Sequence, residues 1–161
     1  MRFEKFTTRF QQAFADAQSL AVGQDNGFIE PLHLLAALLG QEEGGTGSLL
    51  ARAGVNLAPL KEAVHTAIAR LPKVEGQGGE VNVSRDLTNL LNLTDRESQR
   101  RGDQFVASEL FLLALTEDKG EAGRLLKAHG LNRNALEKAI ESVRGGQSVE
   151  NADTEDQREA L

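Results

Sequence analysis

The stretch DNGFIEPLHLLAALL, residues 25–39, decides the fold because its pattern returns later in the chain. A turn signal comes first, then a proline at a helix-start position, then an apolar run typical of a buried helix. The stretch RGDQFVASELFLLAL, residues 101–115, has the same turn signal and apolar run, with Ser108 in place of the proline. Three pairs of residues are each 77 positions apart: Phe28 and Phe105, Ala37 and Ala114, and Leu38 and Leu115. This spacing indicates one structural unit present twice.

Charge and cysteine content exclude several classes of function. A net charge of −6 over 161 residues argues against nucleic acid or an anionic membrane as the main partner, because both would repel the chain. The absence of cysteine excludes disulfides and thiolate metal sites. No apolar stretch approaches the roughly 18 residues of a membrane span, and the first 14 residues lack the apolar core of a signal peptide. We therefore expect a cytoplasmic protein.

The composition predicts an all-α fold. Leu, Ala, Glu, Gln and Arg are frequent, and alternating β-branched residues are confined to VNV at 81–83. We expect two pseudo-twofold-related four-helix repeats packed into one globular domain over residues 1–143. Repeat 1 spans about 5–71, an inter-repeat loop spans 72–83, and repeat 2 spans about 84–143.

The starts of the two repeats and the end of the chain can also be predicted. Thr7 or Thr8 caps the first helix, and Ser84 stands 77 positions after Thr7. Residues 144–161 contain two glycines followed by a polar, acidic run. Such a segment buries too little apolar surface to offset its ordering entropy. We expect it to be a flexible linker to an ATPase region beyond Leu161.

The order of these motifs resembles the Clp N-terminal domain family. The resemblance rests on FTTRFQQAFADAQSLA at the start, on FIEPLHLLAALL and FVASELFLLAL, and on the echo between LLARAGVN and LLKAHGLN. The middle segment RLPKVEG and the exit RGGQSV resemble the ClpB disaggregase branch in particular. The resemblance covers the whole chain, from Met1 to Leu161.

The resemblance implies a function and a set of partners. The domain would recognise exposed apolar segments of misfolded or aggregated polypeptides, which a homohexameric AAA+ chaperone then threads in cooperation with a DnaK-type system. No G-x-x-x-x-G-K-[ST] phosphate loop occurs in the chain, so ATP and magnesium are expected in separate ATPase modules. The isolated domain is expected to be monomeric and not an enzyme.

A comparison of the repeats singles out two leucines as candidates for a binding groove. Leu93 corresponds to Asp16, and Leu110 corresponds to His33, so each is apolar where the other repeat is polar. The alternative is that Leu93 covers the neighbouring unit and Leu110 is ordinary core. The resemblance implies a substrate groove bounded by Leu93, Glu97 and Leu110, in which the family usually has an apolar residue at the middle position. An unpaired Glu97 would weaken the groove for neutral segments and favour clients that carry Lys or Arg.

The resemblance also marks four polar positions, Thr7, Ser84, Asp103 and Glu109. A structural explanation exists for each of them. Thr7 and Ser84 are natural N-caps, Asp103 follows a glycine in a turn, and Glu109 suits the start of a helix.

Catalytic and metal chemistry find little support in the residues. His33, His65 and His129 do not form an H-E-x-x-H or other close ligand pattern, and His33 is expected to be a packed, hydrogen-bonded core residue. No serine has the G-x-S-x-G context of a hydrolase. We therefore expect no metal site, and an alternative function remains: docking of a folded adaptor through a charged patch, as in ClpA and ClpC relatives.

Overall fold

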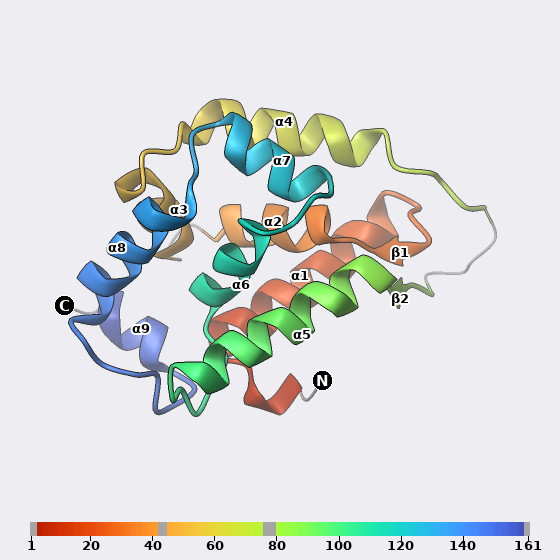
Figure 1. The fold of residues 1–161 in the computed structure, drawn as a ribbon. Helices are drawn as coiled ribbons and strands as arrows, with labels where there is room; N and C mark the ends of the chain where they lie inside the picture. The colour runs from red at the N-terminus through yellow and green to blue at the C-terminus, as the bar shows by residue number, and fades with distance from the viewer. Residues whose placement is uncertain (1–2, 42–44, 76–79, 160–161) are drawn as a thin grey trace.

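The computed structural model describes residues 3–41, 45–75 and 80–159, and its helices follow the order expected from the repeat (Figure 1). The first unit contains α1 (Thr8–Gly23), α2 (Pro31–Leu39), α3 (Gly45–Arg52) and α4 (Leu57–Ala69). The second contains α5 (Arg85–Arg100), α6 (Ser108–Leu115), α7 (Glu121–Ala128) and α8 (Arg133–Arg144). The other elements are η1 (Phe3–Lys5), β1 (Phe28–Ile29), β2 (Asn82–Val83) and α9 (Thr154–Glu159). The predicted all-α class is confirmed. Residues 76–79 of the expected inter-repeat loop lie outside the described residues.

The two units begin in the same way. The Thr7 hydroxyl accepts a hydrogen bond from the Phe10 N–H at 3.2 Å, and the Ser84 hydroxyl accepts one from the Leu87 N–H at 3.1 Å. Each bond satisfies one of the orphan donors at a helix N-terminus. The predicted N-caps of α1 and α5 are therefore confirmed, and they are separated by the 77 positions of the repeat.

Short strand pairings join each unit to the other. Ile29 of β1 pairs in parallel with Val83 of β2, and Val106 pairs in parallel with Phe6. The same bond occurs in both places: the Ser84 N–H donates to the Ile29 carbonyl, and the Thr7 N–H donates to the Val106 carbonyl, each at 3.0 Å. These contacts match at an offset of 77 residues, as a pseudo-twofold arrangement of the two units requires.

The core lies around α2 and α6, which Figure 1 places between the pair α1 and α5 and the pair α4 and α7. Every residue of α6 is buried, including the polar Ser108 and Glu109. An apolar surface all round this helix is thus explained by neighbours on every side rather than by an open groove. Within the described residues, no helix is long and apolar enough to cross a membrane.

The segment after α8 does not behave as the expected linker. Val149 is only 1% exposed, and its carbonyl accepts a hydrogen bond from the Gln104 N–H at 2.7 Å. The segment after α4 runs back in a similar way, with the Val74 N–H donating to the Asp25 carbonyl at 2.8 Å. Residues 144–156 therefore belong to the folded domain. The physical reason is that this segment returns to the turn before the second helix of its own unit, as the connection after α4 does.

Two glycine turns meet at the contact between the units. Gly54 follows α3 with φ of 92°, and Gly130 follows α7 with φ of 107°, a region in which L-residues are strained. A Cβ on Gly130 would lie 2.9 Å from the Gly54 carbonyl oxygen, whereas a Cβ on Gly54 would meet nothing within 4 Å. The two positions share the backbone strain but differ in the space around them.

This difference predicts unequal costs for the same substitution. Gly54→Ala is expected to lower the free energy of unfolding by about 1 kcal/mol through backbone strain alone. Gly130→Ala is expected to cost about 2 kcal/mol or more, because the neighbouring backbone must also move. Urea unfolding of the two variants measures the difference, and equal costs would show that the two turns do not pack closely.

Candidate functional site

The structure separates the three residues of the expected groove. Leu93 lies on α5 with 36% of its surface exposed, and Glu97 follows one turn later on the same helix. Leu110 lies on α6 and has no exposed surface. Leu93 can therefore meet a partner directly, but Leu110 is a core residue in this conformation, which agrees with the alternative reading of that position.

Glu97 is the centre of a group of arginines. Its carboxylate accepts hydrogen bonds from Arg100 at 2.5 Å, from Arg101 at 3.3 Å and from Arg133 at 3.3 Å. The side chain of Glu97 is only 14% exposed. Burial acts to raise its pKa, but the hydrogen bonds and charges of Arg100 and Arg101 together lower the pKa below its usual value. Glu97 is therefore ionised and already paired.

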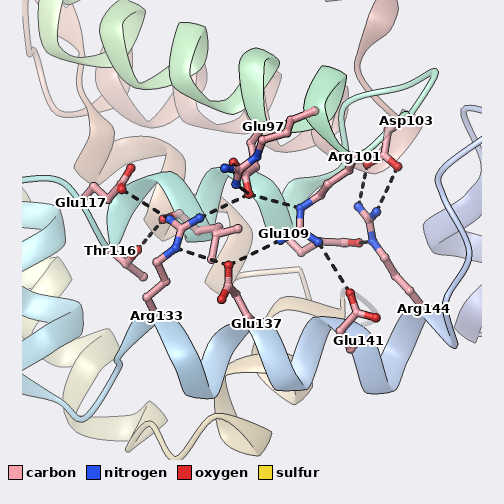
Figure 2. Close-up of polar contacts among 12 residues, drawn as sticks. Glu97, Arg101, Asp103, Glu109, Thr116, Glu117, Arg133, Glu137, Glu141 and Arg144 are labelled. Carbon is pink, nitrogen blue, oxygen red and sulfur yellow. Dashed lines mark hydrogen bonds and ion pairs between the residues drawn. The ribbon is translucent and has the colours of Figure 1, made fainter.

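The pairing continues across the surface to α8, as Figure 2 shows. Arg133 lies 3.4 Å from Glu137 and 3.7 Å from Glu117, and Arg101 lies 3.7 Å from Glu137. We call this group the α5–α8 ion network; its members are Glu97, Arg100, Arg101, Glu117, Arg133, Glu137 and Glu141. It connects α5 with α8, and sequence reasoning did not identify it. Only its pairs within one helix, at spacings of three and four residues, could have been found from the sequence.

A second cluster lies deeper, around Arg144 at the end of α8. Its guanidinium binds both carboxylate oxygens of Asp103, at 3.0 and 2.9 Å, and donates to Glu109 at 2.9 Å. The side chains of Arg144, Asp103 and Glu109 are 6%, 0% and 6% exposed. Burial acts to lower the pKa of Arg144, but Glu109 and Asp103 raise it, so the residue stays charged. This cluster fixes the end of α8 to the turn before α6 and to its first turn.

The remaining two polar candidates lie in different places. Thr7 is buried, and its hydroxyl donates to the Glu155 carboxylate at 2.8 Å. Ser84 caps α5 and pairs with Ile29 through its backbone. Thus Thr7 and Asp103 hold the segment that follows α8, and Glu109 holds Arg144 at the end of that helix. The contacts of Ser84 lie at the other strand pairing. The structure gives each of the four a structural role.

The histidines form no metal site. His33 is buried and hydrogen-bonded to Glu30 and Asn26, so the prediction of a packed core histidine is confirmed. Within residues 3–41, 45–75 and 80–159, no group of three His, Cys, Asp or Glu side chains could hold a metal ion.

Comparisons with known proteins agree with this fold. The family model described as Clp repeat (R) N-terminal domain matches residues 5–129. The chain is 45% identical to the chaperone protein ClpB of Pseudomonas putida over 161 residues, which are 100% of this chain and 19% of that protein. It is 46% identical over 158 residues to ClpB of Dichelobacter nodosus, covering 98% of this chain and 18% of that protein. The chain therefore spans about a fifth of the length of these curated relatives.

A solved structure has the same architecture. The crystal structure of the Hsp104 N-terminal domain from Candida albicans matches with a TM-score of 0.83 at 24% identity, over 94% of this chain and 99% of that chain. Domains of this kind are non-catalytic accessory domains of AAA+ chaperones. The chain belongs to the Clp N-terminal domain family, and within that family it is similar to the N-terminal domains of ClpB.

Proposed function

We propose that this domain recognises exposed apolar segments of misfolded or aggregated polypeptides for a ClpB-type AAA+ chaperone. The observation that carries the proposal is Leu93, which is 36% exposed on a helix that buries its other three leucines. Full burial of an exposed leucine contributes about 1.5–3 kcal/mol, so a partner that covers the exposed third of Leu93 can gain roughly 0.5–1 kcal/mol. The ClpB name of the curated relatives supports the assignment.

The same proposal implies how the rest of the chaperone would be organised. ATP and magnesium would bind in ATPase modules outside this domain, which would assemble the homohexamer and work with a DnaK-type system. One apolar anchor and a few neighbouring contacts must offset the ordering of a flexible client. The affinity of the isolated domain is therefore expected to be micromolar or poorer.

The ion network changes what is expected of Glu97. Because its carboxylate is already paired with Arg100, Arg101 and Arg133, a basic client gains little from it unless it displaces one of these arginines. A neutral apolar segment would have to lie against these charged side chains. It would displace the water that solvates them without pairing their charges, which costs free energy. Glu97 is thus expected to weaken apolar binding by organising the network rather than by attracting basic clients.

Substitutions beside Leu93 test this proposal. Leu93→Gln is expected to weaken binding of a fluorescently labelled, neutral apolar peptide several-fold, because the apolar contact of Leu93 is lost and a polar amide is desolvated in its place. Glu97→Leu is expected to tighten it about tenfold, because it removes the centre of the network and adds an apolar side chain. Leu110 is left unchanged because its substitution would unfold the core.

The matched control is Glu121→Leu on α7, which removes an exposed carboxylate that also pairs with an arginine three residues later, at 3.3 Å. This variant is expected to bind like the unmodified chain. If Leu93→Gln binds normally and circular dichroism shows an intact fold, the α5 surface is not the binding site.

The second candidate function is docking of a folded adaptor. It is favoured by the exposed outer members of the α5–α8 ion network, since the side chains of Arg100, Glu141 and Glu117 are 66%, 64% and 60% exposed. The dependence of binding on salt concentration distinguishes the two functions. Apolar binding at Leu93 should change little between low and high salt, whereas docking on the network should weaken several-fold.

A further inference from the structure

The acidic end of the described chain lies across the starts of two helices. Glu155 is only 8% exposed, and one of its carboxylate oxygens accepts a hydrogen bond from the Ser108 N–H, at the first residue of α6, at 2.6 Å. Its other oxygen accepts from the Thr7 hydroxyl at 2.8 Å and from the Ser108 hydroxyl at 3.4 Å. A carboxylate from a distant part of the sequence therefore fills a set of converging donors.

We call residues 150–156 the tail. Three of its residues besides Glu155 bind the start of α1. The Thr8 hydroxyl donates to Asp153 at 2.8 Å, and the Arg9 side chain donates to Asp156 at 2.6 Å. The Thr8 N–H donates to the carbonyl of Ala152 at 2.8 Å. The consecutive residues 7–9 thus provide two hydroxyls, a main-chain N–H and a guanidinium. With two helix N-termini beside them, they form a positively polarised site in a chain whose net charge is −6.

The tail is attached to this site more like a ligand than like a core element. From residue 150 to residue 156, Glu155 alone is buried, and the others are exposed or half-buried. The connection from α8 to these residues begins with Gly145 and Gly146, which both have positive φ, at 59° and 83°. Polar contacts, rather than a hydrophobic face, hold residues 150–156 in place. Such contacts exchange readily with water and with other carboxylates.

Space for a larger occupant exists beside Glu155. A cavity of about 180 Å³ is lined by residues that include Arg9, Thr46, Arg52, Ser108 and Glu155. Arg52 comes from α3 and donates to the Ser142 hydroxyl at 3.0 Å. The cavity therefore brings a second arginine close to the carboxylate-binding donors.

We propose that Thr7, Thr8, Arg9 and Ser108 form a receptor for acidic peptide segments, which the chain's own residues 153–156 occupy in cis. An acidic segment of a partner polypeptide binds by displacing them. The tail has an effective concentration on the order of millimolar, so the unmodified chain should bind such segments only weakly. This receptor is formed by residues other than Leu93 and Glu97 and does not depend on the function proposed for that surface.

The test uses the full chain with Glu155→Gln and Asp156→Asn as the receptor. The probe is a fluorescein-labelled peptide with the sequence of residues 151–159, NADTEDQRE. Fluorescence anisotropy at low salt is expected to show at least tenfold tighter binding to this variant than to the unmodified chain. A peptide with Gln and Asn at the same two positions is expected to lose binding at least tenfold.

Ser108→Pro, added to the receptor variant, provides the matched control. It removes the main-chain donor at the start of α6, and the repeat places Pro31 at the equivalent position, the first residue of α2. The fold should therefore survive while peptide binding falls at least tenfold.

Hydrogen exchange of residues 149–156 shows whether the tail has left the site. A tail that stays protected in the receptor variant would overturn the proposal, because its carboxylates would not be what holds it. Equal peptide binding by the unmodified and variant chains, or no binding by a variant with a released tail, would overturn it as well.

Discussion

Replacing Arg144 by methionine is expected to lower the free energy of unfolding by about 3–5 kcal/mol. The substitution leaves Asp103 and Glu109 in the interior without the guanidinium that binds both of them. The Asp103 carboxylate would keep the Val149 N–H, which donates to it at 2.9 Å, but a single main-chain donor does not balance a buried charge. Chemical denaturation at neutral pH measures the loss.

Two further variants keep this prediction testable if Arg144→Met fails to fold. The triple variant Arg144→Met, Asp103→Asn, Glu109→Gln removes all three charges and is expected to regain most of the stability. Arg124→Met, which breaks an exposed pair with Glu121, is expected to cost less than about 1 kcal/mol. Similar losses for Arg144→Met and Arg124→Met would contradict the interpretation of the buried cluster.

The sequence was sufficient for features that depend on local spacing. The residues that α5 buries, Leu87, Leu90, Leu91, Thr94 and Ser98, are three or four positions apart or adjacent, as one face of a helix requires. The caps Thr7 and Ser84 and the proline at the start of α2 are likewise where they were expected. Periodicity and capping act within a few residues, so a single sequence contains the necessary information.

Features that depend on distant partners could not be predicted in this way. Nothing in the sequence pairs Glu97 with Arg133, 36 positions later, or Arg144 with Asp103. The burial of Leu110 depends on how the second unit packs around α6, which periodicity does not reveal. For the same reason, comparing the repeats could not decide whether Leu93 and Leu110 line a groove or belong to the packed interior.

The tail shows how composition can mislead. A polar, acidic segment has the composition of a linker, and its few buried side chains decide the outcome. One signal was present: the dipeptide Val-Glu follows the fourth helix of both units, at Val74 and again at Val149. Extending the repeat comparison beyond residue 143 would have suggested that the tail folds back, as the first connection does.

His33 is expected to make the stability of the domain depend on pH. Its Nδ1 accepts a hydrogen bond from the Glu30 N–H at 2.8 Å, so in the neutral ring the proton is on Nε2, which lies 2.9 Å from the Asn26 side-chain oxygen. Burial lowers the pKa of His33 from 6.5 to about 4. If Nδ1 took up a proton, it could no longer accept the hydrogen bond from the Glu30 N–H, and two N–H donors would then face each other.

The sign of the effect follows from which state binds the proton first. As the pH falls below 6.5, the unfolded chain takes up a proton at His33 while the folded chain does not. The stability contributed by the neutral ring is therefore complete above pH 6.5 and is lost progressively down to about pH 4. At about 1.4 kcal/mol per unit of pKa difference, the full loss is about 3 kcal/mol.

His33→Asn isolates this contribution, because asparagine stays neutral and its side-chain oxygen can accept from the Glu30 N–H. The variant should be less stable at pH 7, since Asn26 loses a partner, but it should lose about 2–3 kcal/mol less than the unmodified chain between pH 7 and pH 4. His65→Asn, at an exposed position of α4, should leave the pH dependence unchanged. Urea unfolding across this range measures all three proteins. Parallel pH profiles for the unmodified chain and His33→Asn would mean that the buried ring takes up its proton as readily in the folded state as in the unfolded one.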